Sequence, residues 1–138
     1  MAYDKTFQAK VWPVIIAAMS NYVAPVFNNR LSFGVPSSLS QFPVGVYQSG
    51  DAGGKNDDYI GQNGWQGPII IRSIDLTLSG AWNKALEVAE ALQTIEHDVY
   101  DISVEIPNPQ QFPVEKLTQG SVYTAGLVVS FGIYPKNI

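Results

Sequence analysis

Cysteine is absent from this 138-residue chain, and histidine occurs once, as His97. Without cysteine there can be no disulfide, thiolate metal ligand or thiol nucleophile, and the redox compartment stays undetermined. A single histidine also makes a zinc site improbable on ligand number, because structural zinc sites use four protein ligands of which most are Cys or His.

Charge is scarce too. Charged residues make up 14% of the chain, against a typical share of roughly 25%. The 12 acidic residues outnumber the 8 basic ones, for a net charge of −4. That balance does not suit a surface that binds phosphate backbones, so we expect no sequence-specific DNA binding. At 46% hydrophobic residues the composition excludes a disordered tail and predicts one domain over residues 1–138, with apolar surface left to cover.

Long apolar runs are missing as well. The most apolar stretch, Val11 to Met19, contains Pro13 and is far shorter than the ~20 residues of a membrane helix. Residues 1–5 have no basic start followed by an apolar stretch, so we expect no secretory signal and a soluble protein.

Two stretches have helical periodicity. Apolar residues recur every three or four positions over 5–21, where Pro13 either kinks the helix or opens a second one. A second helix is predicted over 82–97, with an apolar stripe of Trp82, Ala85, Leu86, Ala89 and Leu92 and with His97 in its last turn. Trp82 is expected in the core, and Trp12 either in the core or at an interface.

Four stretches read as strands: 42–47, 68–79, 100–106 and 121–134. In the second, a bulge near Arg72 would bring all the aliphatic side chains to one face. The element order predicts an α+β fold, with a mainly antiparallel sheet, two helices packed on one face, and a long Gly-rich loop.

The last strand differs on its two faces. One face is apolar and expected in the core: Tyr123, Ala125, Leu127, Val129, Phe131 and Ile133. The other face carries small, half-apolar residues, among them Val128, Ser130 and Gly132. Because that face is neither charged nor suited to helix packing, we expect Val128, Ser130 and Gly132 to contact another subunit.

Residues 49–67 contain six of the twelve glycines and no sustained periodicity, which predicts a long loop or a loose hairpin. Loops of this length in small domains are usually functional or disordered. Its large apolar residues are Tyr59, Ile60 and Trp65, which we expect to contact a partner that orders the loop.

The familiar catalytic patterns are incomplete. Around Lys55, a phosphate loop would need Gly at 49 and Ser or Thr at 56, where the chain has Ser49 and Asn56. The acidic residues of the same loop do not have EF-hand spacing. His97 with Asp98 and Asp101 has no nucleophile elbow to serve, and Glu87 with Glu90 reads as a solvated helix face. We expect no catalytic residue, no cofactor and no metal.

The arrangement as a whole resembles a known family. An N-terminal helix is followed by the segment VPSSLSQFPVGVY at 35–47, a Gly/Asp loop, the strand IDLTLS at 74–79, the helix 85–95 and two closing strands. Over nearly the whole chain this order is similar to the tail-terminator and tail-completion (head-tail joining) proteins of tailed bacteriophages. Its departures from that pattern are the length of the 49–67 loop and Pro13 within the first helix.

The resemblance implies a structural virion protein that assembles in the host cytoplasm. It would form a ring, most often a hexamer, that ends the tail tube and joins it to the neck or connector protein, with DNA passing through the lumen. The low, negative charge suits such a lumen, because it repels phosphates. Two alternatives stay open: a receptor- or glycan-binding module of a fibre or baseplate, using Tyr47, Tyr59 and Trp65, and a small hydrolase.

Overall fold

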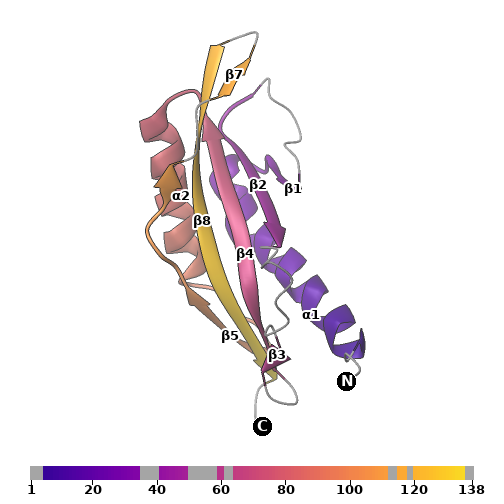
Figure 1. The fold of residues 1–138 in the computed structure, drawn as a ribbon. Helices are drawn as coiled ribbons and strands as arrows, with labels where there is room; N and C mark the ends of the chain where they lie inside the picture. Colours follow the sequence, from indigo (N-terminus) through magenta and orange to yellow (C-terminus); the bar gives the residue numbers. More distant parts are fainter. Residues whose placement is uncertain are drawn as a thin grey trace.

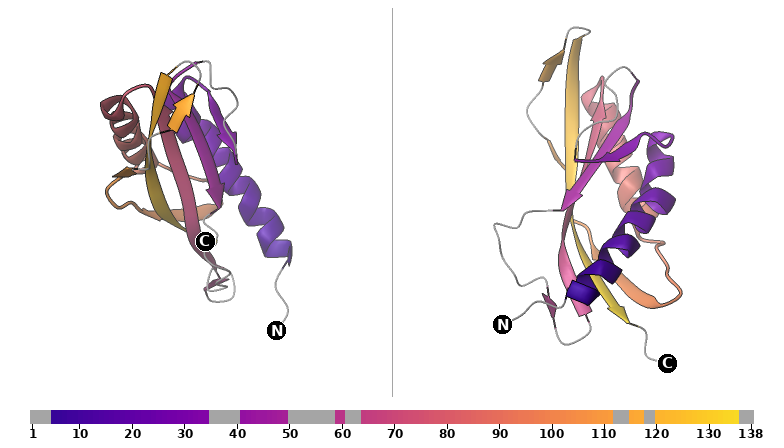
Figure 2. Two further views of the ribbon diagram at one scale, coloured as in Figure 1. Left: turned by 45° about the horizontal axis from the view of Figure 1, so that its top comes forward. Right: turned by 90° about the vertical axis from the view of Figure 1, so that its right-hand side faces the viewer.

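The structure is a computed structural model that describes residues 5–34, 41–49, 59–60, 64–111, 115–117 and 120–135. Both helices lie on one face of a mostly antiparallel sheet (Figures 1 and 2). The α+β fold expected from the element order is therefore confirmed. The expected loop falls largely on residues 50–58 and 61–63, which lie outside the described part of the chain.

The first helix, α1, runs without interruption through Pro13, so neither a second helix nor a break begins there. Its end changes pitch twice, first to a wider π turn and then to a tighter 3-10 turn, before Asn28 and Asn29 adopt φ values of 54° and 65°. Asparagine tolerates this left-handed conformation better than most residues, which explains why the helical segment stops here. The three pieces are α1 (Lys5–Ala18), η1 (Met19–Val23) and η2 (Ala24–Phe27).

The second helix, α2 (Leu78–Leu92), begins and ends about four residues before its predicted bounds. Its start is set by Thr77, whose hydroxyl accepts a hydrogen bond from the Gly80 N–H at 3.0 Å. Such an N-cap satisfies one of the unpaired donors of the first turn. The buried stripe is Ala81, Ala85, Val88 and Leu92.

Two members of the predicted stripe are displaced from the core. Leu86 is 41% exposed, so its expected core position is wrong, and Trp82 packs at the margin of the core. Ala85 and Leu92 belong to both the predicted and the observed stripe, whereas Ala81 and Val88 take the buried places predicted for Trp82 and Leu86. The predicted face is therefore rotated about the helix axis by less than the roughly 100° of one residue.

The sheet contains, among the described residues, five strands in the order β1-β2-β4-β8-β5, with β3, β6 and β7 paired at their margins. The β1–β2 pair is parallel, and the other pairs are antiparallel. The strands are β1 (Leu31–Phe33), β2 (Val44–Ser49), β3 (Tyr59–Ile60), β4 (Gly64–Asp75), β5 (Tyr100–Glu105), β6 (Gln110–Gln111), β7 (Glu115–Leu117) and β8 (Gly120–Pro135).

The bulge expected near Arg72 is absent. The β4–β8 register is unbroken from Trp65↔Ile133 to Asp75↔Tyr123. Ile69 and Ile71 therefore face the helices and belong to the main core, whereas Ile70 and Ile74 point to the other face. Alternation within an unbroken strand places aliphatic residues on both sides of this sheet.

The main core lies between the sheet and the helices. The apolar face predicted for the last strand is confirmed, since Ala125, Leu127, Val129, Phe131 and Ile133 are all buried there and Tyr123 packs against them. The helical side contributes Val14, Ile15, Ala18, Met19, Val23 and Phe27 from α1, η1 and η2, and the buried stripe of α2.

Candidate interaction surface

The sheet face opposite the helices is covered at its ends and open in its middle. Its central row runs across three strands, because Gln48 pairs with Ile70 and Ile70 pairs with Val128. The next row pairs Pro68 with Ser130. Val128 is 40% exposed, and the other four are partly exposed. We call these five residues the helix-free patch.

One end of this face is closed by Tyr134. Gly132 is buried, and a Cβ added to it would come within 2.8 Å of the Tyr134 ring and 2.7 Å of the Ser103 hydroxyl. Of the three residues expected at a subunit contact, Val128 and Ser130 thus lie in the open patch, and Gly132 lies beneath a neighbouring side chain.

The other end is closed by a small second core. Val46, Ile74 and Val122 are buried together, and Phe42 packs against them. This cluster lies on the same face as the helix-free patch, as the pairing of Val44 with Ile74 and of Val46 with Arg72 requires. Among the described residues of this face, the exposed apolar surface therefore lies in the middle of the sheet.

Arg72 connects this face to the sheet edge. Its Nη2 atom lies 3.3 Å from Oε1 of Gln48 and 3.5 Å from the carbonyl oxygen of Gly34, the residue after β1. The guanidinium thus reaches across β2 to the end of β1. A side chain that appeared misplaced on an apolar strand face is accounted for by these two acceptors.

The backbones of Tyr59, Ile60 and Trp65, the expected partner contacts, lie in a small hairpin. Tyr59 of β3 pairs with Trp65 of β4, and Ile60 pairs with Gly64. Trp65 also pairs with Ile133 of β8, so of the two alternatives for this segment, a long loop or a loose hairpin, its backbone agrees with the hairpin. Glycines at 64 and 67 interrupt the hydrophobic pattern that would have revealed this part of the strand.

An aromatic group on the helix side of the β1 edge was not anticipated. Phe33 contacts Trp12 of α1 and Tyr47 of β2 edge to face, with ring centroids 5.7 and 5.3 Å apart. Phe33 is 52% exposed, whereas Tyr47 is 8% exposed and its burial raises the pKa of the phenol. The three residues come from separate segments, so no local pattern could have grouped them.

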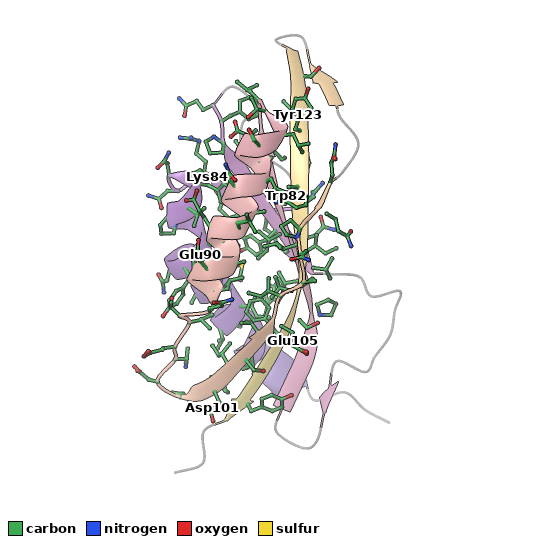
Figure 3. All side chains as sticks on the ribbon, turned by 90° about the vertical axis from the view of Figure 1, so that its left-hand side faces the viewer. Trp82, Lys84, Glu90, Asp101, Glu105 and Tyr123 are labelled. Carbon is green, nitrogen blue, oxygen red and sulfur yellow. The ribbon has the colours of Figure 1, made fainter. Side chains whose placement is uncertain are left out.

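His97, Glu87 and Glu90, the titratable residues considered in the sequence as catalytic candidates, lie outside any common site. His97 lies beyond the end of α2, and its Nδ1 accepts hydrogen bonds from the N–H groups of Val99 and Tyr100 at 3.0 and 3.2 Å. Its expected place in the last helical turn is therefore wrong. Glu87 and Glu90 are exposed on α2, and Glu87 forms an ion pair with Lys84 at 3.4 Å. Lys84 and Glu90 are labelled in Figure 3.

In the described part of the chain, no three His, Asp or Glu side chains come together as a possible metal site. The described helices include none with the length and apolarity needed to cross a membrane. Comparison with protein-family models and with curated proteins finds no match to this chain.

Proposed function

We propose that this protein is a structural subunit of a tailed-bacteriophage virion, which forms a ring, in the simplest case a hexamer, at the head-proximal end of the tail tube. The observation that carries the proposal is the asymmetry of the sheet. Its inner face packs against α1, η1, η2 and α2 to form the main core, while the opposite face leaves the helix-free patch open. An apolar patch on a sheet with few charges fits a surface covered by protein.

The composition supports the same assignment. Subunit interfaces are depleted of charge at their centres, and this chain has few charged residues to place there. The excess of acidic over basic residues would keep DNA from adhering to the ring as it passes through. The partners would be further copies of the chain, the tail tube protein and the neck protein, and the role would be geometric rather than catalytic.

One of the three aromatic residues expected to bind a glycan in the alternative function is unsuited to that role. Tyr47 is buried between Phe33 and the main core, so it cannot present its ring to a sugar. A stacking platform would need exposed aromatic faces, and this position supplies none.

A density map of an intact particle of the phage that encodes this chain tests the proposal. We expect a closed ring of copies where the tail tube meets the neck. A map with one isolated copy, or with the chain at the distal fibres, would contradict the ring and support a binding module.

A genetic experiment gives an independent reading. Particles produced without this chain should contain filled heads and separate tails of irregular length, and adding the purified chain should restore joining. Normal tails attached to heads in its absence would exclude a terminating or joining role.

A further inference from the structure

The sheet has two open sides among its described strands. β1 pairs only with β2, β5 pairs only with β8, and the two lie at opposite sides of the sheet (Figure 1). At β1 the carbonyl of Arg30 accepts from Gly45, and the N–H of Gly34 donates to Tyr47. Since backbone groups alternate in direction along a strand, those of Leu31 and Phe33 point away from β2.

The same alternation can be followed to β5. The registers of β2 with β4, β4 with β8 and β8 with β5 are unbroken, so the direction of each backbone group is fixed strand by strand. It follows that Asp101, Ser103 and Glu105 bond to β8, whereas Ile102 and Val104 present their N–H and C=O groups outward. Tyr100 fits this alternation: its backbone should also point away from β8, and its N–H donates to His97 rather than to β8.

Both edge strands carry apolar side chains on the helix side of the sheet. Phe33 packs with Tyr47 on the helix side of β1, and Leu31 joins the main core there. Ile102 and Val104 pack on the helix side of β5 and are partly buried. A pairing of β1 with β5 would therefore continue the apolar layer and cover Phe33, which is 52% exposed.

The charges of the two edges are opposite. At β1, the Arg30 Nε donates to the Pro43 carbonyl at 3.1 Å, and the Arg72 guanidinium reaches Gly34. At β5, Asp101 and Glu105 are exposed near the two ends of the strand (Figure 3). Among the described residues the one ion pair is Lys84–Glu87, so none of these four charges has an ionic partner there.

The charge spacing also agrees. On β1 the positive charges lie at residue 30 and, through the Arg72 guanidinium, at residue 34; on β5 the negative charges lie at residues 101 and 105. On each edge the two charges are thus four residues, or about 13 Å, apart. Within one sheet, β1 and β5 run in opposite directions, as the strand pairings show. A second copy in the same orientation would consequently bring its β1 antiparallel to β5.

We propose that β1 of one copy pairs antiparallel with β5 of the next, joining neighbouring subunits in one continuous sheet. The register that satisfies backbone, face and charge together sets Leu31 opposite Val104 and Phe33 opposite Ile102. It places Arg30 beside Glu105. It also places Gly34, which the Arg72 guanidinium contacts, beside Asp101. This contact is heterologous, the kind that closes into a ring when the rotation between copies allows it. It deepens the ring proposed above and rests on it.

Disulfide trapping tests the pairing in a chain that has no cysteine of its own. In this register Ser32 faces Ser103 as a non-hydrogen-bonded pair, with Cα atoms about 4.5 Å apart, within reach of a disulfide. In one chain these residues stand at opposite sides of the sheet, four strand spacings or at least about 19 Å apart. A disulfide between them must join two copies.

The full chain carrying Ser32→Cys and Ser103→Cys should give, after mild oxidation at high protein concentration, a ladder of dimers, trimers and larger species on a non-reducing gel. Each single variant should stop at the dimer. The matched control, Ser79→Cys with Ser103→Cys, uses an exposed serine at the start of α2 and should give no ladder. A double variant that yields no ladder overturns the pairing.

Charge exchange checks the register. Glu105→Arg should reduce trapping several-fold, and adding Arg30→Glu in the same chain should restore it, whereas Glu90→Lys on α2 should have no effect. A loss that the second substitution does not restore contradicts the pairing of Arg30 with Glu105.

The edge contact and the virion role can fail separately. A ring seen in particles, without disulfide trapping between positions 32 and 103, would overturn the edge contact alone. Trapping without a ring in particles would overturn only the virion role.

Discussion

The ring of Phe27 lies directly against Gly45, so that a Cβ added to this glycine would come within 2.5 Å of two ring carbons. Phe27 is fully buried at the end of the 3-10 turn η2, and Gly45 is in β2. The absence of a side chain at one position thus allows the helical segment to approach the sheet. Leu31 would also be 2.9 Å from the added atom, so two core side chains would have to shift to accommodate it.

Gly45→Ala should therefore lower the free energy of unfolding by about 2 kcal/mol, the usual cost of overpacking a core. Chemical denaturation would measure it. Combining Gly45→Ala with Phe27→Leu should cost less than the sum of the two single variants, because the smaller side chain relieves the clash. Additive effects would show that the clash is relieved elsewhere.

Ser73 is buried in β4, 1% exposed, and no partner for its hydroxyl lies among the described residues. An unsatisfied buried hydroxyl costs free energy. We expect Ser73→Ala to leave the stability unchanged or to raise it by up to about 1 kcal/mol. Thr124, also buried, provides a comparison as Thr124→Ala. Destabilisation by Ser73→Ala of more than about 1 kcal/mol would mean that the hydroxyl has a hydrogen-bond partner.

The Thr77 N-cap of α2 should make a measurable contribution to the free energy of unfolding. Thr77→Ala removes the acceptor of the Gly80 N–H and should cost about 1 kcal/mol, whereas Thr77→Ser should retain most of the stability. Thermal unfolding of the three proteins would measure the difference. Equal losses in both variants would point to the methyl group of Thr77 rather than its hydroxyl.

Burial of Tyr47 predicts a loss of stability at alkaline pH. Because burial raises the pKa of this phenol in the folded protein, the unfolded chain ionises first, near pH 10. The free energy of unfolding should thus be independent of Tyr47 below that pH and fall as the pH rises through the folded-state pKa. Tyr47→Phe should reduce the slope above pH 10. An unchanged slope would exclude Tyr47 as its source.

Periodicity predicted the elements with strong side-chain patterns. The core face of β8 was predicted correctly, because Leu127, Val129 and Phe131 alternate with small residues over a long strand. The shift of α2 by about four residues arose where Leu78 and Ser79 continue the strand pattern. The capping hydroxyl of Thr77, two residues after the end of β4, starts the helix and is a local signal that periodicity does not include.

The features missed depend on contacts between distant segments. β1 has three residues and becomes a strand only by pairing with β2. The bulge at Arg72 was inferred to gather the aliphatic residues on one side, but the second core around Val46 and Ile74 gives the other face its own apolar role. Arg72 itself is tolerated because Gln48 and Gly34, from two other segments, supply its acceptors.

The helix-free patch yields the last prediction. Val128 is 40% exposed, so Val128→Asp should change the stability of the isolated chain by no more than about 1 kcal/mol, the range of strand propensities. If the patch is covered by another protein subunit of the particle, burying the new carboxylate there without a partner would cost several kcal/mol.

Assembly into particles, measured as the fraction of tails joined to heads, should then fall strongly for Val128→Asp. Leu86→Asp is the matched control, since Leu86 is 41% exposed on α2 and the substitution adds the same charge on the opposite side of the molecule. Equal effects of the two variants would attribute the loss to charge alone. Unfolding of Val128→Asp would place Val128 in the subunit's own core, and normal joining would leave the patch uncovered in the virion, because a buried unpaired carboxylate cannot be accommodated without loss.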